Sequence, residues 1–441
     1  MRRLAVVGAG ISGLATAHAL AGEAQVTLFE AGEHFGGHTH TVDITLPTPQ
    51  GPVTHGVDTG FLVFNHRTYP QLVKLFDALG VQTAASDMSF SVQAPEAVGG
   101  GLEWSGCSLN TVFAQRRNLL RPRFLGMLRD ILRFNRLATA LAERGADAEL
   151  AEPIADFLAR EGFGAPFRDW YFLPMIGCIW SCPTDQMLRF PVGTMIRFCH
   201  NHGLIQVAER PQWRTVRGGA RHYVTKLLQA IPDARLKTPV RRVERVPPGQ
   251  GQAGVRLATD AGTAHFDDVV LACHSDQALA LLADATPAER AVLGTIRTHP
   301  NEAVLHTDAT VLPRRRLAWA AWNYARAASA GREQAAVCLH YLINRLQPLP
   351  WSQPVLVSLN PDPARPPDPA QVLGRYRYRH PVFDAAAVRA QAGLPQIQGH
   401  SHLWFAGAWT RYGFHEDGLM SAQAVVQGLR TRWQATAAVA A

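Results

Sequence analysis

Residues 4–30 read LAVVGAGISGLATAHALAGEAQVTLFE and decide the fold of the N-terminal part of the chain. The apolar run Leu4–Val7 leads directly into Gly8, Gly10 and Gly13, which have the spacing G-x-G-x-x-G, and a helix-length segment follows. In this motif the first glycine permits a tight turn, the second lets a pyrophosphate approach the backbone, and the third lets the helix pack against the strand. The helix N-terminus then attracts the phosphates. The stretch therefore predicts a strand–helix–strand unit that binds a dinucleotide.

Glu30 ends the second β-rich run, Val26–Phe29. An acid about 20 residues after the glycine motif accepts hydrogen bonds from ribose hydroxyls. Its carboxylate would also repel a 2′-phosphate. A glycine-rich turn before an ordinary helix would not require this acid, so the combination favours a dinucleotide site.

The size and composition of the chain indicate a folded protein of more than one domain. Its 441 residues are too many for one ordinary core, so we expect two domains. Hydrophobic residues make up 47% and charged residues 18%, which is not typical of a disordered chain. The formal net charge of +8 favours acidic partners: anionic substrates, an anionic membrane or nucleic acid. Because the arginines are dispersed and no nucleic-acid-binding module is recognisable, we expect no nucleic acid among them.

Neither a disulfide framework nor a metal site is expected. The six cysteines are far apart in the sequence. Cys178 and Cys182 with His200 and His202 do not have a usual zinc spacing, and the cysteines lie in an apolar run. The first strand begins directly after the N-terminal Met-Arg-Arg, which leaves no room for an apolar signal region, and no run of about 20 apolar residues occurs. These features predict a cytoplasmic protein.

Glycine-rich β-structure follows directly after the second strand. Gly36-Gly37 marks a tight turn or a close backbone approach, and a predicted hairpin over residues 41–57 leads into Asp58-Thr59-Gly60. Apolar residues at helical spacing then predict a helix over Tyr69–Leu79, with Gly80 as its stop. This is more than a bare nucleotide-binding half.

These motifs resemble the glutathione-reductase-like FAD fold, and within it the flavin amine oxidase superfamily. The matching features are VVGAGISGLATAHAL (6–20), the acid at the end of the next strand, the Gly-Gly pair and the D-x-G at 58–60. LWFAG (403–407) and GFHEDGLMSAQAVVQG (413–428) fit the segment that crosses the flavin ring in this superfamily, which includes amine oxidases, protoporphyrinogen oxidases and phytoene-type desaturases. The resemblance implies FAD as the cofactor and leaves the substrate open.

We therefore predict an α/β fold in which an FAD-binding, Rossmann-like domain of the glutathione-reductase and amine-oxidase type carries an inserted α+β substrate domain. The FAD-binding domain is expected to be discontinuous and to comprise residues 1–80, 205–280 and 395–441. The substrate domain is expected to comprise residues 81–204 and 281–394. The first insertion is rich in helix, and the second contains strand-like runs at 302–306, 317–323 and 337–344.

The resemblance implies cofactor contacts along the whole chain. The residues that it assigns to FAD binding are Gly8, Gly10, Ile11, Ser12, Gly13, Glu30, Ala31, Gly36, Gly37, His38, Thr39, Asp58, Thr59, Gly60, Phe61, Val240, Ala272, Gly407, Gly418, Leu419 and Ser421. Val240 matches the position that contacts the adenine ring. Two departures matter: His38 stands where the superfamily often has an arginine, and no cysteine follows Cys338, which excludes the covalent flavin linkage of monoamine oxidases.

Three ionisable residues, His415, Glu416 and Asp417, lie where the flavin-facing loop is expected. The functional interpretation makes one of them a catalytic proton acceptor or donor beside flavin N5. In the structural alternative, Asp417 caps the following helix and His415 packs against the FAD-binding domain. Trp409 and Tyr412 are candidates for the aromatic pair that encloses the amine in amine oxidases, but aromatic residues near a flavin are common packing residues too.

Further patterns resemble a bacterial subgroup of predicted FAD oxidoreductases that is associated with the modification of unsaturated or methylated fatty acyl chains. The matching stretches are FGGHTHTVD (35–43), VDTGFLVFN (57–65) and WRTVRGGARHYV (213–224). The subgroup implies desaturation, or isomerisation, at an allylic carbon of a lipid. The reduced flavin would need O2 or a quinone as electron acceptor, because no second dinucleotide fingerprint is present for NAD(P)H.

Residues 116–136, RRNLLRPRFLGMLRDILRFNR, combine seven arginines with apolar residues at helical spacing: Leu125, Leu128, Ile131 and Leu132. Such a segment can lie on an anionic bilayer, which would place the protein peripherally on the inner face of the membrane. In the alternative, its apolar face packs on the protein and its arginines are solvated. The apolar run 170–180 similarly reads either as the lining of a tunnel or as core.

The leading prediction is an FAD-dependent enzyme that removes hydride from an activated C–H bond of an apolar substrate, above all an acyl chain. His415 or Glu416 would accept the second proton. One alternative is a flavin amine oxidase that uses O2. Another is a non-catalytic FAD-binding module associated with a membrane or a protein partner.

Overall fold

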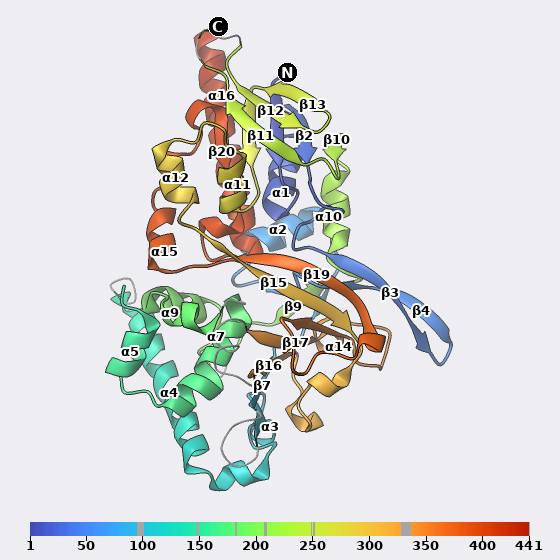
Figure 1. Ribbon diagram of the computed structural model, residues 1–441, viewed down its shortest axis with the longest axis vertical. Coiled ribbons are helices and arrows are strands. Elements are labelled where there is room, and N and C mark those ends of the chain that lie inside the picture. The colour runs from blue at the N-terminus through green and yellow to red at the C-terminus, as the bar shows by residue number, and fades with distance from the viewer. Residues whose placement is uncertain are drawn as a thin grey trace.

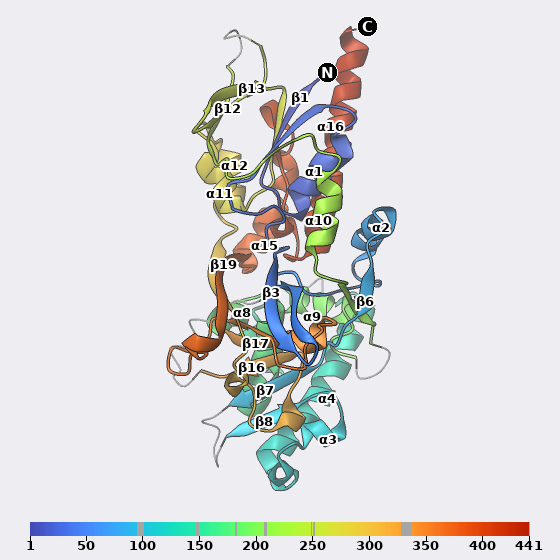
Figure 2. The same ribbon diagram turned by 90° about the vertical axis from the view of Figure 1, so that its right-hand side faces the viewer.

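The fold is described by a computed structural model of the chain. The description covers residues 1–441 except 95–100, 147–149, 181–182, 207–209, 248, 250–251, 328–336 and 441. Figures 1 and 2 show the N- and C-termini at the same end of the molecule. Within the described ranges, no helix combines the length and the apolar character needed to cross a membrane.

Five parallel strands form a sheet at the end of the molecule that holds both termini (Figure 1), in the order β10-β2-β1-β14-β20. They are β1 (Arg3–Val7), β2 (Gln25–Phe29), β10 (Asp233–Arg235), β14 (Asp268–Leu271) and β20 (Leu403–Phe405). The strands come from three separate parts of the chain, and the glycine motif lies in the turn after the central strand β1. Ligands of such sheets bind at the carboxyl ends of the strands.

The two faces of this sheet are buried in different ways, because alternate residues of β1 point to opposite sides. Leu4 and Val6 share an apolar core with helices, whereas Ala5 and Val7 pack toward a three-stranded sheet. The helices are α1 (Ile11–Leu20), α10 (Arg221–Leu228) and α16 (His415–Ala440), and the strands of the smaller sheet are β11 (Val240–Arg245), β12 (Val255–Thr259) and β13 (Gly262–Phe266). Cover on both faces explains why the strands are continuous apolar runs.

A seven-stranded mixed sheet forms the other half of the molecule, in the order β19-β15-β18-β17-β16-β7-β8. Its strands are β7 (Phe90–Ala94), β8 (Leu102–Ser105), β15 (Thr298–His306), β16 (Trp322–Ala325), β17 (Cys338–Leu342), β18 (Leu356–Leu359) and β19 (Val372–Pro381). Figure 1 shows helices gathered beside this sheet, among them α4 (Pro122–Glu143), α5 (Ile154–Arg160), α7 (Leu173–Trp180) and α9 (Val192–Asn201). The sheet thus joins strands from residues 81–204 with strands from residues 281–394.

The remaining elements connect these two halves. The predicted hairpin is confirmed as β3 (Thr41–Thr48) and β4 (Gly51–Asp58), and the predicted helix after it as α2 (Pro70–Ala78). The short strands β5 (Phe64–Asn65), β6 (Thr83–Ala85) and β9 (Trp213–Val216) form a further three-stranded sheet, and α11 (Ser275–Leu281) and α12 (Pro287–Leu293) follow β14.

The predicted strand over residues 317–323 is largely wrong. Residues Arg316–Ala318 form a 3-10 turn, and β16 begins only at Trp322. The carboxylate of Glu103 accepts hydrogen bonds from the backbone N–H groups of Arg314 and Arg315. These contacts hold the chain in a turn, and nothing in the local apolar pattern announces them.

Candidate active site

A cavity of about 890 Å³ runs between the two halves of the molecule. Its nucleotide end is lined by the turn after β1 and by residues that follow β2 and β14, namely Gly8–Ser12, Glu30, Ala31, His34, Gly36–His38 and Ala272–His274. Its apolar end is lined by Met88, Phe90, Met175, Cys178–Trp180, Phe198, His202, Leu204, Trp213, Trp322 and Tyr341. The segment 407–415, including His415, lines the same cavity.

The turn after β1 has the geometry that the glycine motif predicts. Gly8 has a φ of +101°, and a Cβ atom there would lie 2.8 Å from the carbonyl oxygen of Ala272. A Cβ atom on Gly13 would lie 1.8 Å from the carbonyl oxygen of Gly8. Gly10 is the N-cap of α1, and a Cβ atom there would meet nothing within 4 Å. The helix N-terminus therefore faces open space, as an anion site requires.

Glu30 stabilises this turn as well as lining the cavity. Its carboxylate accepts hydrogen bonds from the backbone N–H groups of Ala9, at 2.8 Å, and Gly32, at 2.7 Å. The acid thus links the ends of β1 and β2. Its role toward the ribose stays a prediction.

Most of the predicted cofactor-binding residues line the cavity: Gly8, Gly10, Ile11, Ser12, Glu30, Ala31, Gly36, Gly37, His38, Gly60, Phe61, Val240, Ala272 and Gly407. The others are not part of its lining: Gly13, Thr39, Asp58, Thr59, Gly418, Leu419 and Ser421. Several of the latter hold the wall in place. Ser12 donates a hydrogen bond to the carbonyl oxygen of Gly418 at 2.9 Å, and Ser421 accepts one from the backbone N–H of Gly407 at 2.9 Å.

Asp58 belongs to this supporting layer. Its carboxylate accepts hydrogen bonds from the backbone N–H of Ala220, from the hydroxyl of Thr41 and from the amide of Gln347. Burial raises the pKa of Asp58 to about 7 despite these bonds. The residue fastens β4 to the segment that leads into α10.

Only one of the three predicted catalytic residues lines the cavity. His415 stacks on Phe61 with ring centroids 3.8 Å apart, and its Nε2 lies 2.9 Å from the hydroxyl of Thr39. Burial lowers the pKa of His415 to about 3, so the imidazole is neutral at pH 7.

Glu416 and Asp417 contact helix ends instead. Glu416 accepts hydrogen bonds from the backbone N–H groups of Gln71 and Leu72, at the N-terminus of α2. Asp417 accepts a hydrogen bond from the backbone N–H of Phe414 at 3.0 Å, just before α16. Burial raises the pKa of both carboxylates, that of Asp417 to about 6. Neither side chain is part of the cavity wall.

His202 also lines the cavity, whereas the sequence suggested it only as a candidate metal ligand. It stacks on Phe198 with ring centroids 3.9 Å apart, and its Nδ1 donates a hydrogen bond to the carbonyl oxygen of Phe198 at 2.9 Å. This bond fixes the tautomer, so Nε2 keeps a free lone pair. Burial lowers the pKa of His202 to about 4. Its partner Cys182 in the metal interpretation lies outside the described residues, and the described residues contain no cluster that could hold a metal.

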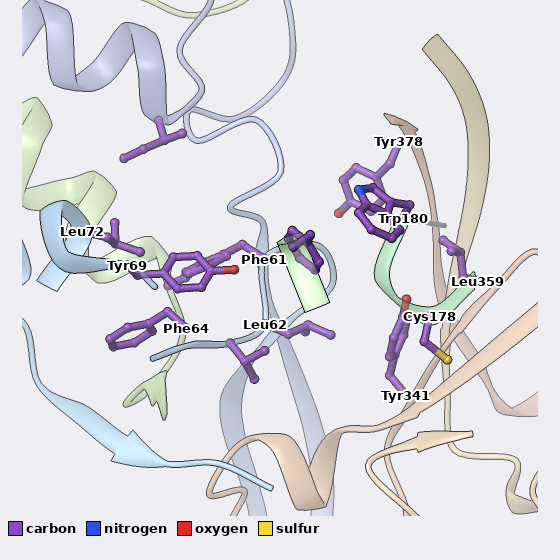
Figure 3. Close-up of a cluster of buried hydrophobic side chains, with 14 of the residues drawn as sticks. Phe61, Leu62, Phe64, Tyr69, Leu72, Cys178, Trp180, Tyr341, Leu359 and Tyr378 are labelled. Atoms are coloured by element: carbon purple, nitrogen blue, oxygen red, sulfur yellow. The ribbon is translucent and has the colours of Figure 1, made fainter. Parts of the chain in front are cut away.

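Aromatic side chains face each other across the apolar end. Figure 3 shows Phe61 and Tyr69 on one side and Trp180, Tyr341 and Tyr378 on the other. Trp409 and Tyr412, the candidates for an amine-enclosing pair, also line the cavity. The indole N–H of Trp409 donates to the carbonyl oxygen of Cys273 at 3.0 Å, which directs this side chain into the surrounding core.

A second cavity of about 410 Å³ adjoins the apolar end. Met88, His202, Leu204 and Trp213 line both cavities, and we refer to these four residues as the neck. The second cavity is otherwise polar and includes Arg210 and Arg345. Arg345 pairs with Asp87 at 3.3 Å, and Arg210 donates to the carbonyl oxygen of Gln206 at 2.8 Å.

Comparisons with known proteins identify the family to which this chain belongs. Residues 11–338 match the family model of the flavin containing amine oxidoreductases. No curated protein sequence matches the chain significantly. Solved structures share the fold at low identity, and the predicted α/β fold class is confirmed.

Three such structures cover nearly the whole chain. A fatty acid isomerase of P. acnes that produces CLA has 15% identity and a TM-score of 0.63, covering 97% of this chain and 98% of its own. Cyclohexylamine oxidase of Brevibacterium oxydans has 16% identity and a TM-score of 0.67, covering 97% and 99%. Putrescine oxidase bound to putrescine has 16% identity and a TM-score of 0.65, covering 98% and 99%.

The residues present fit the family's cofactor, FAD. The open helix N-terminus at Gly10 leaves room for a diphosphate, and the cavity is also lined by Glu30 and by Gly407. The chain belongs to the flavin-containing amine oxidoreductase family and is an FAD-dependent oxidoreductase.

Proposed function

We propose that this enzyme removes hydride from an activated, allylic C–H bond of a fatty acyl chain, which gives desaturation or double-bond isomerisation. The observation that supports this is the lining of the cavity. Beyond the nucleotide end, apolar and aromatic side chains dominate, and Glu30 is the only carboxylate among the described residues that line it. Such a wall suits an uncharged chain, whereas a protonated amine would find no anionic partner there. The fold alone does not decide, since a fatty acid isomerase and amine oxidases share it.

FAD, when bound, supplies the acceptor for the hydride. The chain's own residues hold the acyl chain, exclude water and take the remaining proton. His415 and His202 are the two histidines at the apolar part of the cavity, and both are neutral at pH 7. We assign the proton-accepting role to one of them, because Glu416 and Asp417 are engaged at helix ends. His202 presents an Nε2 lone pair, which is the atom that would receive the proton.

The neck and the second cavity support an amphipathic substrate. An acyl chain could pass the neck while its head group stays in the polar second cavity, near Arg210 and Arg345. A carboxylate or a phosphate is the group that guanidinium side chains bind best. The electron acceptor would be O2 or a quinone.

The test is anaerobic mixing of the purified enzyme with lipid or amine while the flavin absorbance at about 450 nm is followed. We expect unsaturated or methyl-branched acyl lipids to bleach the flavin, and primary amines and polyamines to leave it oxidised. Bleaching by amines but not by lipids would instead establish an amine oxidase. A flavin that stays oxidised with every compound, together with lipids that are recovered without a new or shifted double bond, would favour a non-catalytic FAD-binding module. Either result overturns the proposal.

We also propose that residues 116–136, together with the exposed Leu109, contact an anionic membrane. The buried face of α4 includes Phe124, Met127 and Phe134. This face is offset from the predicted apolar face, which contains Leu125 and Leu132. Large apolar side chains are therefore left exposed here, and their exposed fractions are 79% for Leu109, 49% for Leu119, 87% for Leu120, 42% for Leu125 and 51% for Leu132. Seven arginines lie within residues 116–136 of the same stretch of sequence. Exposed leucines among arginines are typical of a surface that inserts into anionic lipid.

Binding to vesicles tests this surface. The protein is expected to sediment with vesicles that contain an anionic phospholipid and to be released by salt, because the arginine contribution is screened. Replacing both Leu119 and Leu120 by serine should lower the partition coefficient roughly tenfold or more, since each leucine contributes about 1.5–3 kcal/mol when buried. Leu373→Ser is the control, because Leu373 is 41% exposed and lies in β19. Equal binding to neutral and anionic vesicles would contradict the prediction.

A further inference from the structure

Tyr69 carries an unpaired hydroxyl group at the apolar end of the cavity. The residue lines the cavity and is only 4% exposed. Its hydroxyl makes no hydrogen bond within the described ranges of the chain, and it is not one of the fully enclosed polar atoms without a partner. In Figure 3 this hydroxyl points toward the wall on which Trp180 and Tyr341 lie. A ligand in the cavity can therefore reach it, and a buried polar group of this kind is normally paired.

The backbone on both sides of Tyr69 is fixed. The side-chain oxygen of Asn65 accepts hydrogen bonds from the backbone N–H groups of Arg67 and Thr68, both at 2.9 Å. The backbone N–H of Tyr69 donates to the carbonyl oxygen of Asn65 at 3.2 Å. Tyr69 is also the N-cap of α2, whose first N–H groups donate to the carboxylate of Glu416. The hydroxyl is therefore held in place before a ligand binds, which lowers the entropic cost of binding.

The phenol of Tyr69 stays protonated at neutral pH. Burial raises the pKa of Tyr69 well above its ordinary value, and the carboxylates of Asp417 and Glu416 act in the same direction. The group therefore remains a hydrogen-bond donor, and its proton needs an acceptor with a lone pair.

Tyr69 lies beside the neck. Its ring centroid is 6.3 Å from those of His202 and Trp213, which are two of the four neck residues. The indole N–H of Trp213 is a second donor, since it too makes no hydrogen bond in the part of the chain that the structure describes. The indole N–H of Trp180 is likewise unpaired among the described residues, but Figure 3 shows this residue on the opposite wall. Two donors therefore lie at the passage between the two cavities.

We propose that the hydroxyl of Tyr69 donates a hydrogen bond to the acyl carbonyl oxygen of the substrate and so anchors the acyl end at the neck. This inference rests on the proposed function, in which the hydrocarbon chain occupies the apolar end and the head group lies in the second cavity. The carbonyl joins the two parts and therefore lies at the passage between them. A carbonyl oxygen has two lone pairs and no proton, so it matches the donors of Tyr69 and Trp213, whereas Nε2 of His202 offers only a lone pair.

The test compares two ligands that differ only at the carbonyl: methyl oleate, and oleyl methyl ether, in which a methylene group replaces the C=O. Their dissociation constants are measured by equilibrium dialysis against the FAD-loaded enzyme, with the flavin kept reduced by dithionite so that no turnover occurs. We expect the native enzyme to bind the ester roughly three- to tenfold more tightly than the ether, because a net hydrogen bond is recovered. In Tyr69→Phe this ratio should fall toward one, while the ether binds as in the native enzyme. Equal binding of the two ligands by the native enzyme would overturn the proposal.

Tyr376→Phe is the matched control, since Tyr376 is half-buried in β19 and lines neither cavity. It should keep the native preference for the ester. A native preference in Tyr69→Phe would overturn the role of Tyr69, and so would loss of FAD from this variant, which would assign the hydroxyl to the cofactor. The proposed reaction fails in a different way: the oxidised native enzyme would then leave acyl lipids unchanged and its flavin unbleached. Loss of the ester preference in Tyr69→Phe would establish the carbonyl contact even in that case.

Discussion

Replacing Gly13 by valine is expected to abolish stable FAD binding. A Cβ atom at this position would lie 1.8 Å from the carbonyl oxygen and 3.0 Å from the carbonyl carbon of Gly8. These are backbone atoms of the turn that faces the cofactor, so no side chain can move away to make room. Gly8 cannot yield easily either, because it has a φ of +101° and lies against the backbone of Ala272. Overpacking of this kind destabilises by about 1–3 kcal/mol or more, which corresponds to a loss of affinity of up to roughly a hundredfold.

The measurement is the ratio of flavin to protein after gel filtration, with circular dichroism as a control for folding. Gly22→Ala serves as the matched variant, since Gly22 follows α1 and a Cβ atom there meets nothing within 4 Å. We expect this control protein to remain yellow and Gly13→Val to be colourless. Native flavin content in a folded Gly13→Val protein would contradict the placement of the diphosphate at this turn.

The first strand–helix–strand unit could be predicted because its signals are local. The apolar run that becomes β1, the glycine spacing and the acid at Glu30 all lie within 30 residues and agree with one another. The other strands of the same sheet are different, because β10, β14 and β20 join it from distant parts of the chain. That these strands belong to the same domain as β1 could be predicted only from the resemblance to a known family.

The roles of polar residues near the flavin loop depended on tertiary contacts. The carboxylate of Glu416 accepts hydrogen bonds from the backbone N–H groups at the start of α2. One of these groups belongs to Gln71, which lies 345 residues earlier in the sequence. A carboxylate in the first turn of a helix can equally be a helix cap, a catalytic base or a solvent-exposed group. The sequence alone does not distinguish these alternatives, whereas the contact with α2 shows that Glu416 caps that helix.

The apolar end of the cavity could not be predicted for a related reason. Met175, Phe198 and Tyr341 are apolar or aromatic residues in regular helices and strands, so they look like ordinary core. Whether they enclose other side chains or a substrate depends on how α7, α9 and β17 are spaced. A similar problem arises for the surface of α4. Two neighbouring apolar stripes of this helix fit the helical period, so the sequence does not show which stripe is buried, and the fold buries only one.

Narrowing the neck with Leu204→Trp is expected to prevent long acyl chains from reducing the flavin while leaving FAD in place. Leu204 lines both the large cavity and the polar second cavity, next to His202 and Trp213. It is half-buried, so an indole can be accommodated without disrupting the core around it. A substrate whose head group stays near Arg210 must pass this point to place an allylic carbon beside the segment 407–415.

The rate of anaerobic flavin reduction by a long-chain acyl lipid should fall by about a hundredfold or more, since forcing a chain past a filled gap costs roughly 3 kcal/mol. Leu317→Trp is the control, because Leu317 is 39% exposed and lies in the 3-10 turn Arg316–Ala318, away from both cavities. The flavin of the Leu317→Trp variant should be reduced at the native rate. A native rate in Leu204→Trp would mean that the acyl chain enters by another route, whereas loss of FAD from this variant would mean that the neck belongs to the cofactor site.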